Sequence, residues 1–345
     1  MAEVRVADVT ADASREAFHR VADAVYAHEP PGTAPVRASI DRTLNQPAFQ
    51  SAGGQRAYVA FENDTAIGRV VARLSPVLRD EHGRPFGMLG FFEAEHRQEA
   101  ADALFREAIA WLRERGAERI VGPMDGDTWH RYRVNVGPFS RPPFPLEPWN
   151  PRYYAELWER AGFRELESYS SKWIADVSLL LPGLRAGVER SASRGVRIRG
   201  LDRTRLEKEL AIVHDISSDI FQDSFLYSPV SRAEFLALYS GIERFLDPDL
   251  VVFATAPEGG EIGFVFAYAD PRLSAVHYKT IGVRAEWRRA AVAAALSDHV
   301  YSNALRKGLP AGNHALMRDD NRSQALDQGH GEVFRRYVLY EWRHV

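Results

Sequence analysis

The stretch AYVAFENDTAIGRVVARL (residues 57–74) and the stretch LVVFATAPEGGEIGFVFAYA (residues 250–269) share one design. In each of them, two runs of β-branched, aromatic and other apolar residues flank a short polar turn. Apolar runs that are bounded by Asn, Asp and Gly are typical of β-hairpins. The sequence therefore predicts two hairpins, one in each half of the chain.

The elements that follow the two hairpins also recur. A further apolar run follows each hairpin, at 86–95 and 275–283, and an amphipathic helix follows each run. Each helix carries apolar residues at steps of three and four, which marks a buried face. Each helix also ends in basic residues before a glycine, Gly116 or Gly308, which is a common helix C-terminus. A short strand then comes next in both halves.

The remaining elements complete the internal repeat. Strands predicted at 4–8 and 196–202, each with a helix after it, precede the hairpins, and further helices are introduced by Asn150 and Asn321. So many elements in one order indicate a duplication. We expect a first domain over residues 1–177, a connector over 178–195 and a second domain over 196–345, a division that suits a chain of 345 residues.

Composition excludes several classes of protein. Apolar residues make up 45% of the chain and charged residues 26%, which is the balance of a folded globular protein. The chain has no cysteine, so thiol nucleophiles, disulfides and cysteine-based zinc sites are excluded. We expect no metal, because no His, Asp and Glu spacing resembles a ligand set. We also expect no membrane span and a cytoplasmic location. The formal net charge of -3 argues against nucleic acid as a partner.

The order of predicted elements resembles the GNAT family of N-acetyltransferases over nearly the whole chain. The residues that carry the resemblance are Ile67-Gly68-Arg69, Gly90-Phe91-Phe92-Glu93, Gly122-Pro123-Met124 and the string PPFPLEPWNPRYYAELWERAGF at 142–163. In its first half the chain also resembles a group of uncharacterised bacterial GNAT-like proteins. The resemblance implies an α/β (α+β) fold of two tandem GNAT-type domains, each a mixed, mostly antiparallel sheet that is flanked by helices.

The resemblance also implies where an acyl-CoA donor would bind. In this family the diphosphate rests on N–H groups at the start of the helix after the fourth strand, where the helix dipole favours anions. The matching stretch in the second domain is Arg288, Arg289, Ala290, Ala291, Val292 and Ala293. Ala291 replaces a family glycine, but we expect ordinary helical φ/ψ there, which alanine adopts freely. The alternative is an alanine-rich helix start without a ligand. In the first domain Glu99 places a carboxylate where a phosphate would lie, so we expect no CoA in that domain.

Groups for the chemistry are less well defined. By resemblance, the N–H that polarises the thioester carbonyl lies near Ile281–Val283, and Asn321 belongs to the donor site. The tyrosine that serves as general acid in the family is replaced by Trp158 in the first domain and by Leu326 or Asp327 in the second. The candidate substitutes and bases, each of which has a structural role as its alternative, are His330, Tyr337, Tyr340, His277 and Glu93.

Two loops have an unusual composition. Residues 126–135 contain a run of aromatic and basic side chains, and residues 221–231 are aromatic and polar. Such side chains can frame a planar or anionic acceptor, or they can pack the two domains together. The candidate acceptor-binding residues are Trp129, His130, Arg131, Tyr132, Arg133, Phe225 and Tyr227.

Three functions remain open from the sequence. The first is an N-acyltransferase that uses acetyl-CoA, another acyl-CoA or an acyl carrier protein thioester to acylate the amine of a small molecule. The second is a Fem-like transferase that depends on aminoacyl-tRNA, because tandem GNAT domains also occur in that family; the net charge argues against it. The third is a non-catalytic small-molecule binding protein, which the missing tyrosines and Ala291 favour.

Overall fold

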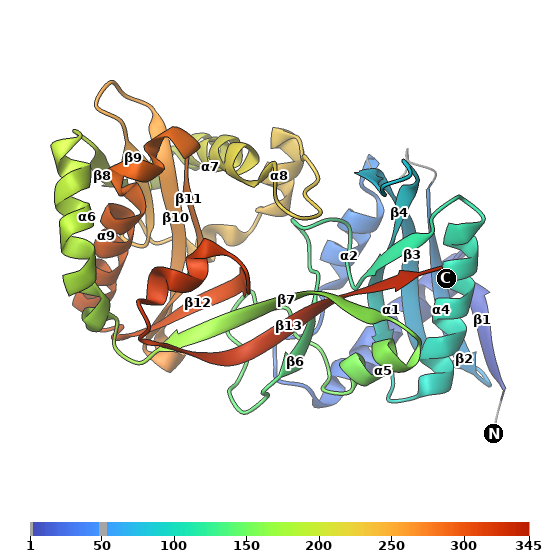
Figure 1. The fold of residues 1–345 in the computed structure, drawn as a ribbon. Helices are drawn as coiled ribbons and strands as arrows, with labels where there is room; N and C mark the ends of the chain where they lie inside the picture. The colour runs from blue at the N-terminus through green and yellow to red at the C-terminus, as the bar shows by residue number, and fades with distance from the viewer. Residues whose placement is uncertain (1–2, 48–53, 345) are drawn as a thin grey trace. The chain divides into compact units, whose positions relative to one another are not determined.

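The computed structural model describes residues 3–47 and 54–344, and its chain divides into two units. The first unit comprises residues 1–168 and 335–345, and the second comprises residues 169–334 (Figure 1). Residues 178–195, which were predicted to be a connector, form the end of a 3-10 turn and a helix inside the second unit. The last strand of the chain returns to the first unit instead of staying in the second.

The first unit is a sheet with helices on both faces. Its strand order is β1-β2-β3-β4-β5-β13, with β6 paired to β13. All of these pairs are antiparallel except β4 with β5. Its elements are β1 (Val4–Asp8), α1 (Asp12–Val25), α2 (Arg37–Leu44), β2 (Gln55–Glu62), β3 (Thr65–Arg79), β4 (Pro85–Ala94), α4 (Gln98–Arg113), β5 (Arg119–Gly122), β6 (Val134–Gly137), α5 (Tyr154–Arg160), the first residues of β7 (Arg164–Ile174) and most of β13 (Gly331–Arg343).

The second unit repeats this plan. Its strand order is β7-β12-β11-β10-β9-β8, and its parallel pair is β11 with β12, the counterpart of β4 with β5. The predicted duplication and both hairpins are thereby confirmed. Its elements are η2 (Val177–Leu180), α6 (Leu181–Ser193), β8 (Arg197–Gly200), α7 (Leu206–Phe221), α8 (Arg232–Leu238), β9 (Val251–Thr255), β10 (Glu261–Asp270), β11 (Ala275–Val283), η6 (Ala285–Ala290), α9 (Val292–Arg306), β12 (Ala311–Arg318) and η7 (Arg322–Asp327).

Strand periodicity explains why each sheet has a core on both faces. Successive side chains of a strand point to opposite sides, so a strand that is apolar throughout must be covered twice. In β2, Tyr58 and Ala60 join the core under α4, whereas Val59 joins the core under α1 and α2. In β9, Val252 belongs to the core with α6 and α9, and Phe253 belongs to the core with α7. The two units therefore share one layered architecture.

The helix predicted after Asn321 is shorter than expected. Asn321 caps the 3-10 turn η7, whose last residue is Asp327. The chain then enters the left-handed region at Gln328 and again at Gly329, which ends the turn. No full helix therefore stands in this place, whereas the first unit has α5 at the equivalent position.

Candidate functional site

A divergence of two parallel strands defines the candidate donor site of the second unit. β11 and β12 pair from Ala275 with Ala311 up to Tyr278 with His314. Beyond this pair β11 continues to Val283 beside β10 alone, while β12 continues to Arg318 beside β7. Within the described residues, the ladder between β11 and β12 thus ends at Tyr278 and His314, and the two strands separate beyond it, as a slot for an extended ligand requires.

A β-bulge lies where the two strands begin to separate. The register of β10 against β11 passes from Phe266 opposite Thr280 to Ala267 opposite Tyr278, so Lys279 is the extra residue. A bulge rotates the local backbone and often lies next to a functional site. Ile281 and Val283, the predicted neighbours of the polarising N–H, lie just past the bulge, opposite Val265 and Gly263 of β10.

The start of α9 lies at the open end of the divergence. Ala291, the residue before the helix, has φ 57° and ψ 30°, which is the left-handed conformation. The expectation of ordinary helical φ/ψ at this alanine is therefore wrong, and the position is one that favours glycine. The N–H groups of Ala294 and Ala295 bond to the carbonyl of Ala291, so an anion would meet those of Val292 and Ala293.

Two arginines beside this helix start carry uncommitted charge. Arg288 and Arg289 are exposed in η6, and neither forms an ion pair among the residues that the structure describes. Their neighbour Arg284 differs, because its Nη1 lies 2.8 Å from Asp219 Oδ2. A helix N-terminus with two free guanidinium groups suits a diphosphate, which accepts charge-assisted hydrogen bonds. Ala290 is buried under the turn and supports it.

Helix α6 packs directly against this region. A Cβ atom on Gly187 would lie 2.5 Å from Cβ of Ala294 and 3.5 Å from Cβ of Ala291. The glycine therefore permits a close approach of α6 to the first turn of α9, and the two helices run side by side in Figure 1. The segment that was predicted to be a connector thus helps to fix the conformation of the candidate site.

The other predicted residues of the second unit lie in three different settings. His277 is fully buried, with Nδ1 2.9 Å from Asn313 Nδ2 and Nε2 3.5 Å from Asp270 Oδ2, and burial lowers its pKa to about 4. Asn321 Oδ1 accepts the N–H of Ser323 and so caps η7. Phe225 lies under the guanidinium of Arg318, and Tyr227 is half-buried in the same loop.

Tyr337 and Tyr340 belong to the first unit, because β13 returns there. The hydroxyl of Tyr337 donates to Glu147, and that of Tyr340 donates to Glu159 Oε1 at 2.9 Å. Both side chains are buried against carboxylates of the first unit. The structure therefore gives each of them a hydrogen-bonding role within the first unit.

The equivalent slot of the first unit is closed. A Cβ atom on Gly90 would lie 2.8 Å from Cα of Asp125, so the segment after β5 lies directly against β4. The N–H of Met124 donates to the carbonyl of Leu89, and the N–H of Phe91 donates to Asp125 Oδ1. Phe91 is the bulge residue of β4, with φ 52°. Its N–H, which corresponds to the region of Lys279, is therefore committed to a carboxylate.

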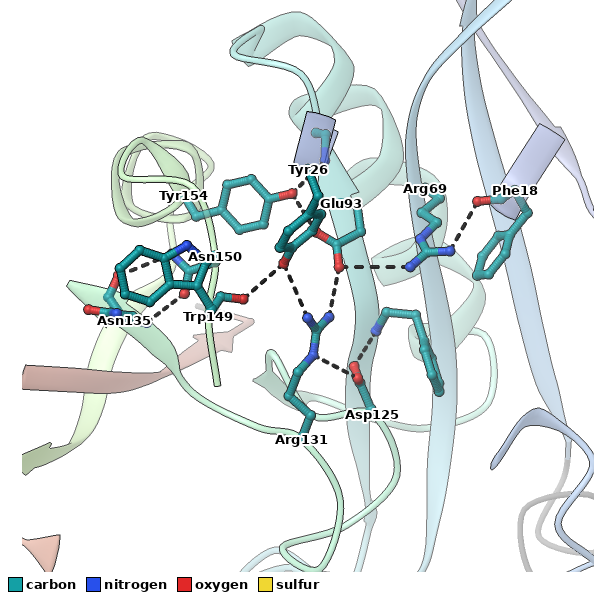
Figure 2. Close-up of polar contacts among 12 residues, drawn as sticks. Phe18, Tyr26, Arg69, Glu93, Asp125, Arg131, Asn135, Trp149, Asn150 and Tyr154 are labelled. Carbon is teal, nitrogen blue, oxygen red and sulfur yellow. Dashed lines mark hydrogen bonds and ion pairs between the residues drawn. The ribbon is translucent and has the colours of Figure 1, made fainter. Parts of the chain in front are cut away.

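Glu93 lies in a buried network beside this closed slot. Its carboxylate accepts hydrogen bonds from Arg131 Nη2 at 2.8 Å and from the Tyr154 hydroxyl at 2.6 Å, as Figure 2 shows. Arg69 Nη2 lies 3.7 Å away, and Arg131 Nε also bonds to Asp125 at 3.1 Å. Two donors thus occupy the carboxylate of Glu93, which argues against its predicted role as a base.

Electrostatics agree with a structural network. Burial raises the pKa of Tyr154, as do the charges around it, so its hydroxyl stays protonated as a donor. Burial alone would lower the pKa of Arg131, but Asp125 and Glu93 raise it well above its usual value. Burial lowers the pKa of Arg69. The pairing of opposite charges stabilises groups that would be costly to bury singly.

A small cavity lies beside this network. Its volume is about 20 Å³, enough for one water molecule and far too small for a pantetheine arm. That the first unit binds no CoA stays a prediction, and the contact of Asp125 with β4 is a structural argument for it. Glu99, whose carboxylate was predicted to lie where a phosphate would bind, is exposed in the first turn of α4. The cavity is lined by Tyr26, Phe92, Pro123, Arg131, Tyr132, Arg133, Val134, Pro148, Trp149, Asn150, Tyr154 and Trp158.

The aromatic and basic loop at 126–135 folds back into the first unit. Arg131 enters the network, and its Nη1 donates to the hydroxyl of Tyr26 at 3.2 Å. His130 Nδ1 lies 2.8 Å from Asp127 Oδ1, and the backbone N–H of Trp129 donates to the same oxygen. The guanidinium of Arg133 lies 3.9 Å from the ring centre of Tyr132. The loop is therefore held by contacts with its own unit.

Sequence reasoning missed several residues of these two regions. Asp125 and Tyr26 bond to Arg131 or to the backbone from positions distant in the chain, and no local motif marks them. Tyr154 lies in the string that carries the family resemblance, but in front of the expected tyrosine position. His314 and Tyr301 of the second unit were also missed.

Within residues 3–47 and 54–344, no group of three or more His, Asp or Glu side chains is arranged to hold a metal ion. In the same ranges, no helix combines the length and apolar character that a bilayer crossing requires.

Comparisons with known proteins support the fold. No family model matches the chain. Protein YghO of Escherichia coli is 24% identical over 211 residues, which cover 61% of this chain and 54% of that protein. The bacterial ceramide synthase of Caulobacter vibrioides is 27% identical over 201 residues, covering 57% of this chain and 52% of that protein. The matched region thus spans about half the length of each of these relatives.

A solved structure shows the same architecture along the whole chain. It is a tandem GNAT protein from the clavulanic acid biosynthesis pathway, and it superposes with a TM-score of 0.57 at 12% identity. The superposition covers 99% of this chain and 98% of that protein, so both units are matched in order. The chain therefore has the tandem GNAT fold, with two copies of the acetyltransferase architecture in one polypeptide.

Proposed function

We propose that the protein is an N-acyltransferase whose second unit binds an acyl-CoA donor between β11 and β12. The observation that carries this proposal is the divergence of these strands after Tyr278 and His314, with the start of α9 at its open end. The first unit, whose equivalent slot is filled by Asp125 and its neighbours, would then have a structural role.

The dimensions of the divergence suit a donor of this kind. From Tyr278 to Val283 the strand rises by roughly 17 Å, at about 3.3 Å per residue. An extended pantetheine arm has a comparable length, so a diphosphate at the start of α9 would place the thioester near the bulge at Lys279. There a backbone N–H of β11 on the side of β12 would polarise the thioester carbonyl as an amine attacks it. The amide product and the free thiol then leave.

The acceptor is proposed to be the amine of a small molecule, and one relative suggests a class. The Caulobacter relative is named a bacterial ceramide synthase, and ceramide synthesis joins a fatty acyl group to the amine of a long-chain amino alcohol. We therefore place long-chain amino alcohols beside short amines among the candidate acceptors. Carrier-protein thioesters remain candidate donors, because they present the same pantetheine arm.

Isothermal titration calorimetry with acetyl-CoA and palmitoyl-CoA tests the donor site. We expect binding by the wild-type chain and a loss of about 10- to 100-fold in affinity for Arg288→Ala/Arg289→Ala, since each charge-assisted hydrogen bond contributes about 1.5–3 kcal/mol before solvent screening. Arg106→Ala/Arg203→Ala removes the same charge from two exposed arginines elsewhere and should bind like the wild type.

An assay for free thiol release then tests the reaction, with ethanolamine and a long-chain amino alcohol as acceptors. Acceptor-dependent thiol release supports the transferase. Binding without release with any acceptor would instead indicate a small-molecule binding protein. A failure of both acyl-CoAs to bind would contradict the proposal, and a salt-dependent tRNA complex would favour the aminoacyl-tRNA-dependent alternative.

A further inference from the structure

A cluster of polar side chains lies at the point where β11 and β12 separate. Tyr278 and His314 form the last residue pair, and Tyr301 of α9 covers them. The ring centre of Tyr278 lies 5.5 Å from that of Tyr301 and 5.3 Å from that of His314. The Tyr278 hydroxyl and Ser297 Oγ, 2.7 Å apart, satisfy each other. All three rings are buried, so their polar atoms need partners.

His314 and Tyr301 form a buried hydrogen bond, in which we infer that the Tyr301 hydroxyl is the donor. The Tyr301 hydroxyl lies 2.6 Å from His314 Nε2, and burial raises the pKa of Tyr301, so its proton stays on oxygen. Burial lowers the pKa of His314 to about 4, so its ring is neutral near pH 7. A neutral ring that accepts at Nε2 carries its single proton on Nδ1.

The Nδ1 atom of His314 is buried and without a hydrogen-bond partner in the described part of the chain. An unpaired buried N–H costs about 1–3 kcal/mol, so a protein seldom keeps one without a role. The charged groups that affect the pKa of His314 are Asp327 and Lys172. They form an ion pair, with Lys172 Nζ 3.0 Å from Asp327 Oδ2. Asp327 raises the pKa of His314 and Lys172 lowers it.

We propose that the Nδ1–H of His314 donates a hydrogen bond to the sulfur of the donor thioester and stabilises the departing thiolate. This inference rests on the proposed function. Asp327 and Leu326 occupy the place where the family carries a tyrosine, and η7 is too short to supply one. His314 on β12, oriented by Tyr301 on α9, provides a donor at the inner end of the slot instead.

The chemical step balances without a further reactant. The acceptor nitrogen forms a bond to the acyl carbon, the carbon–sulfur bond breaks, and its electron pair stays on sulfur. A proton that the nitrogen loses reaches the thiolate through solvent, and His314 keeps its own proton. His314 acts on the developing negative charge, as a preorganised donor does in other acyl transfers.

The principal test uses His314→Phe/Tyr301→Phe, which removes both partners and leaves rings of similar shape, so the fold should survive. With palmitoyl-CoA we expect kcat to fall about 100-fold, the magnitude for the loss of one such donor, while the Kd of CoA stays unchanged. Tyr239→Phe, a tyrosine of the same unit that packs on Phe235 away from this cluster, should keep the wild-type rate.

Leaving-group dependence separates this role from a purely structural one. A palmitoyl thioester of an aromatic thiol releases a weaker base, which needs less stabilisation than the thiolate of CoA. With this thioester, the kcat of the double variant should therefore fall by less than about 5-fold, a small part of the effect of losing one hydrogen-bond donor. Equal losses with both donors, or no loss with palmitoyl-CoA, would overturn the inference alone. A wild-type chain that transfers no acyl group would overturn the proposed function, and the inference with it.

The imidazole proton can also be observed directly. Nitrogen-15 NMR of His314 in the wild-type chain at pH 7 should show the Nδ1-protonated tautomer, and Tyr301→Phe should release that preference. A proton found on Nε2 would contradict the inference whatever the activity.

Discussion

Ala291 gives a direct test of the backbone at the candidate donor site. Its φ of 57° places a Cβ atom in the left-handed region, which costs an alanine about 1–2 kcal/mol relative to glycine. The change Ala291→Gly removes this cost and restores the residue that the family pattern carries. Donor binding should persist, because the backbone N–H groups of Val292 and Ala293 keep their directions.

A matched variant isolates the free-energy cost of the left-handed backbone conformation. Ala293 lies two residues later, is also half-buried and has helical geometry, so Ala293→Gly should lower the free energy of unfolding by about 1 kcal/mol. Both changes remove one methyl group and add similar freedom to the unfolded chain. The difference between the two variants should therefore equal the left-handed cost, with Ala291→Gly the more stable by about 1–2 kcal/mol.

Urea unfolding followed by circular dichroism measures this difference, and thermal scans should show a gap of about 2–8 °C in the same direction. The reasoning would be refuted if Ala291→Gly lost as much stability as Ala293→Gly. A large loss of acyl-CoA affinity in Ala291→Gly would separately contradict the proposal that backbone N–H groups hold the diphosphate.

Three further predictions follow from other parts of the structure. Arg131→Met should lower the free energy of unfolding, measured in urea, by about 3–5 kcal/mol, because it leaves Glu93 and Asp125 buried without their arginine partner. The control is Arg106→Met at an exposed position, and an equally small loss of stability in both variants would contradict the network. Gly187→Ala should destabilise the protein by about 1–3 kcal/mol, because the new methyl group clashes with Ala294. The control Gly183→Ala meets only the flexible end of Gln328 and should have almost no effect on stability. Equal effects of the two changes on the denaturation midpoint would count against the close packing of α6 on α9. Burial lowers the pKa values of His277 and His314 to about 4, against about 6.5 in an unfolded chain. Between these pH values the unfolded chain binds more protons than the folded chain. The contribution of these histidines to the free energy of unfolding should therefore be constant above pH 6.5, and it should fall by up to about 1.4 kcal/mol per pH unit for each histidine as the pH drops toward 4. A free energy of unfolding that does not change between pH 7 and 5 would contradict this.

Local patterns predicted most of the architecture. The hairpins, the amphipathic helices and their order follow from periodicity and turn residues, which act over a few positions. The pairing partner of a strand is not encoded in this way. β13 contains the run that ends at Tyr340 and follows the second unit in sequence, yet it pairs with β5 of the first unit. Tyr337 and Tyr340, which fall within the predicted second domain over residues 196–345, therefore belong to the first unit.

The candidate site was predictable only in outline. The position of the donor stretch at 288–293 followed from the family resemblance, and the structure places it at a helix start beside diverging strands. The left-handed φ of Ala291 was not predictable, because alanine is a strong helix former and gives no local sign of this conformation. Asp125 and the pair of His314 with Tyr301 depend on contacts between segments distant in sequence, which composition does not reveal.

Hydrogen–deuterium exchange with and without saturating palmitoyl-CoA tests the central claim most directly, because it reports which backbone amides the donor covers. We predict slower exchange in peptides that span residues 279–296 and 314–318, and unchanged exchange in peptides that span residues 86–101 and 120–133. Slower exchange confined to the first unit, or no change in either unit at saturating donor, would contradict the assignment of the donor site.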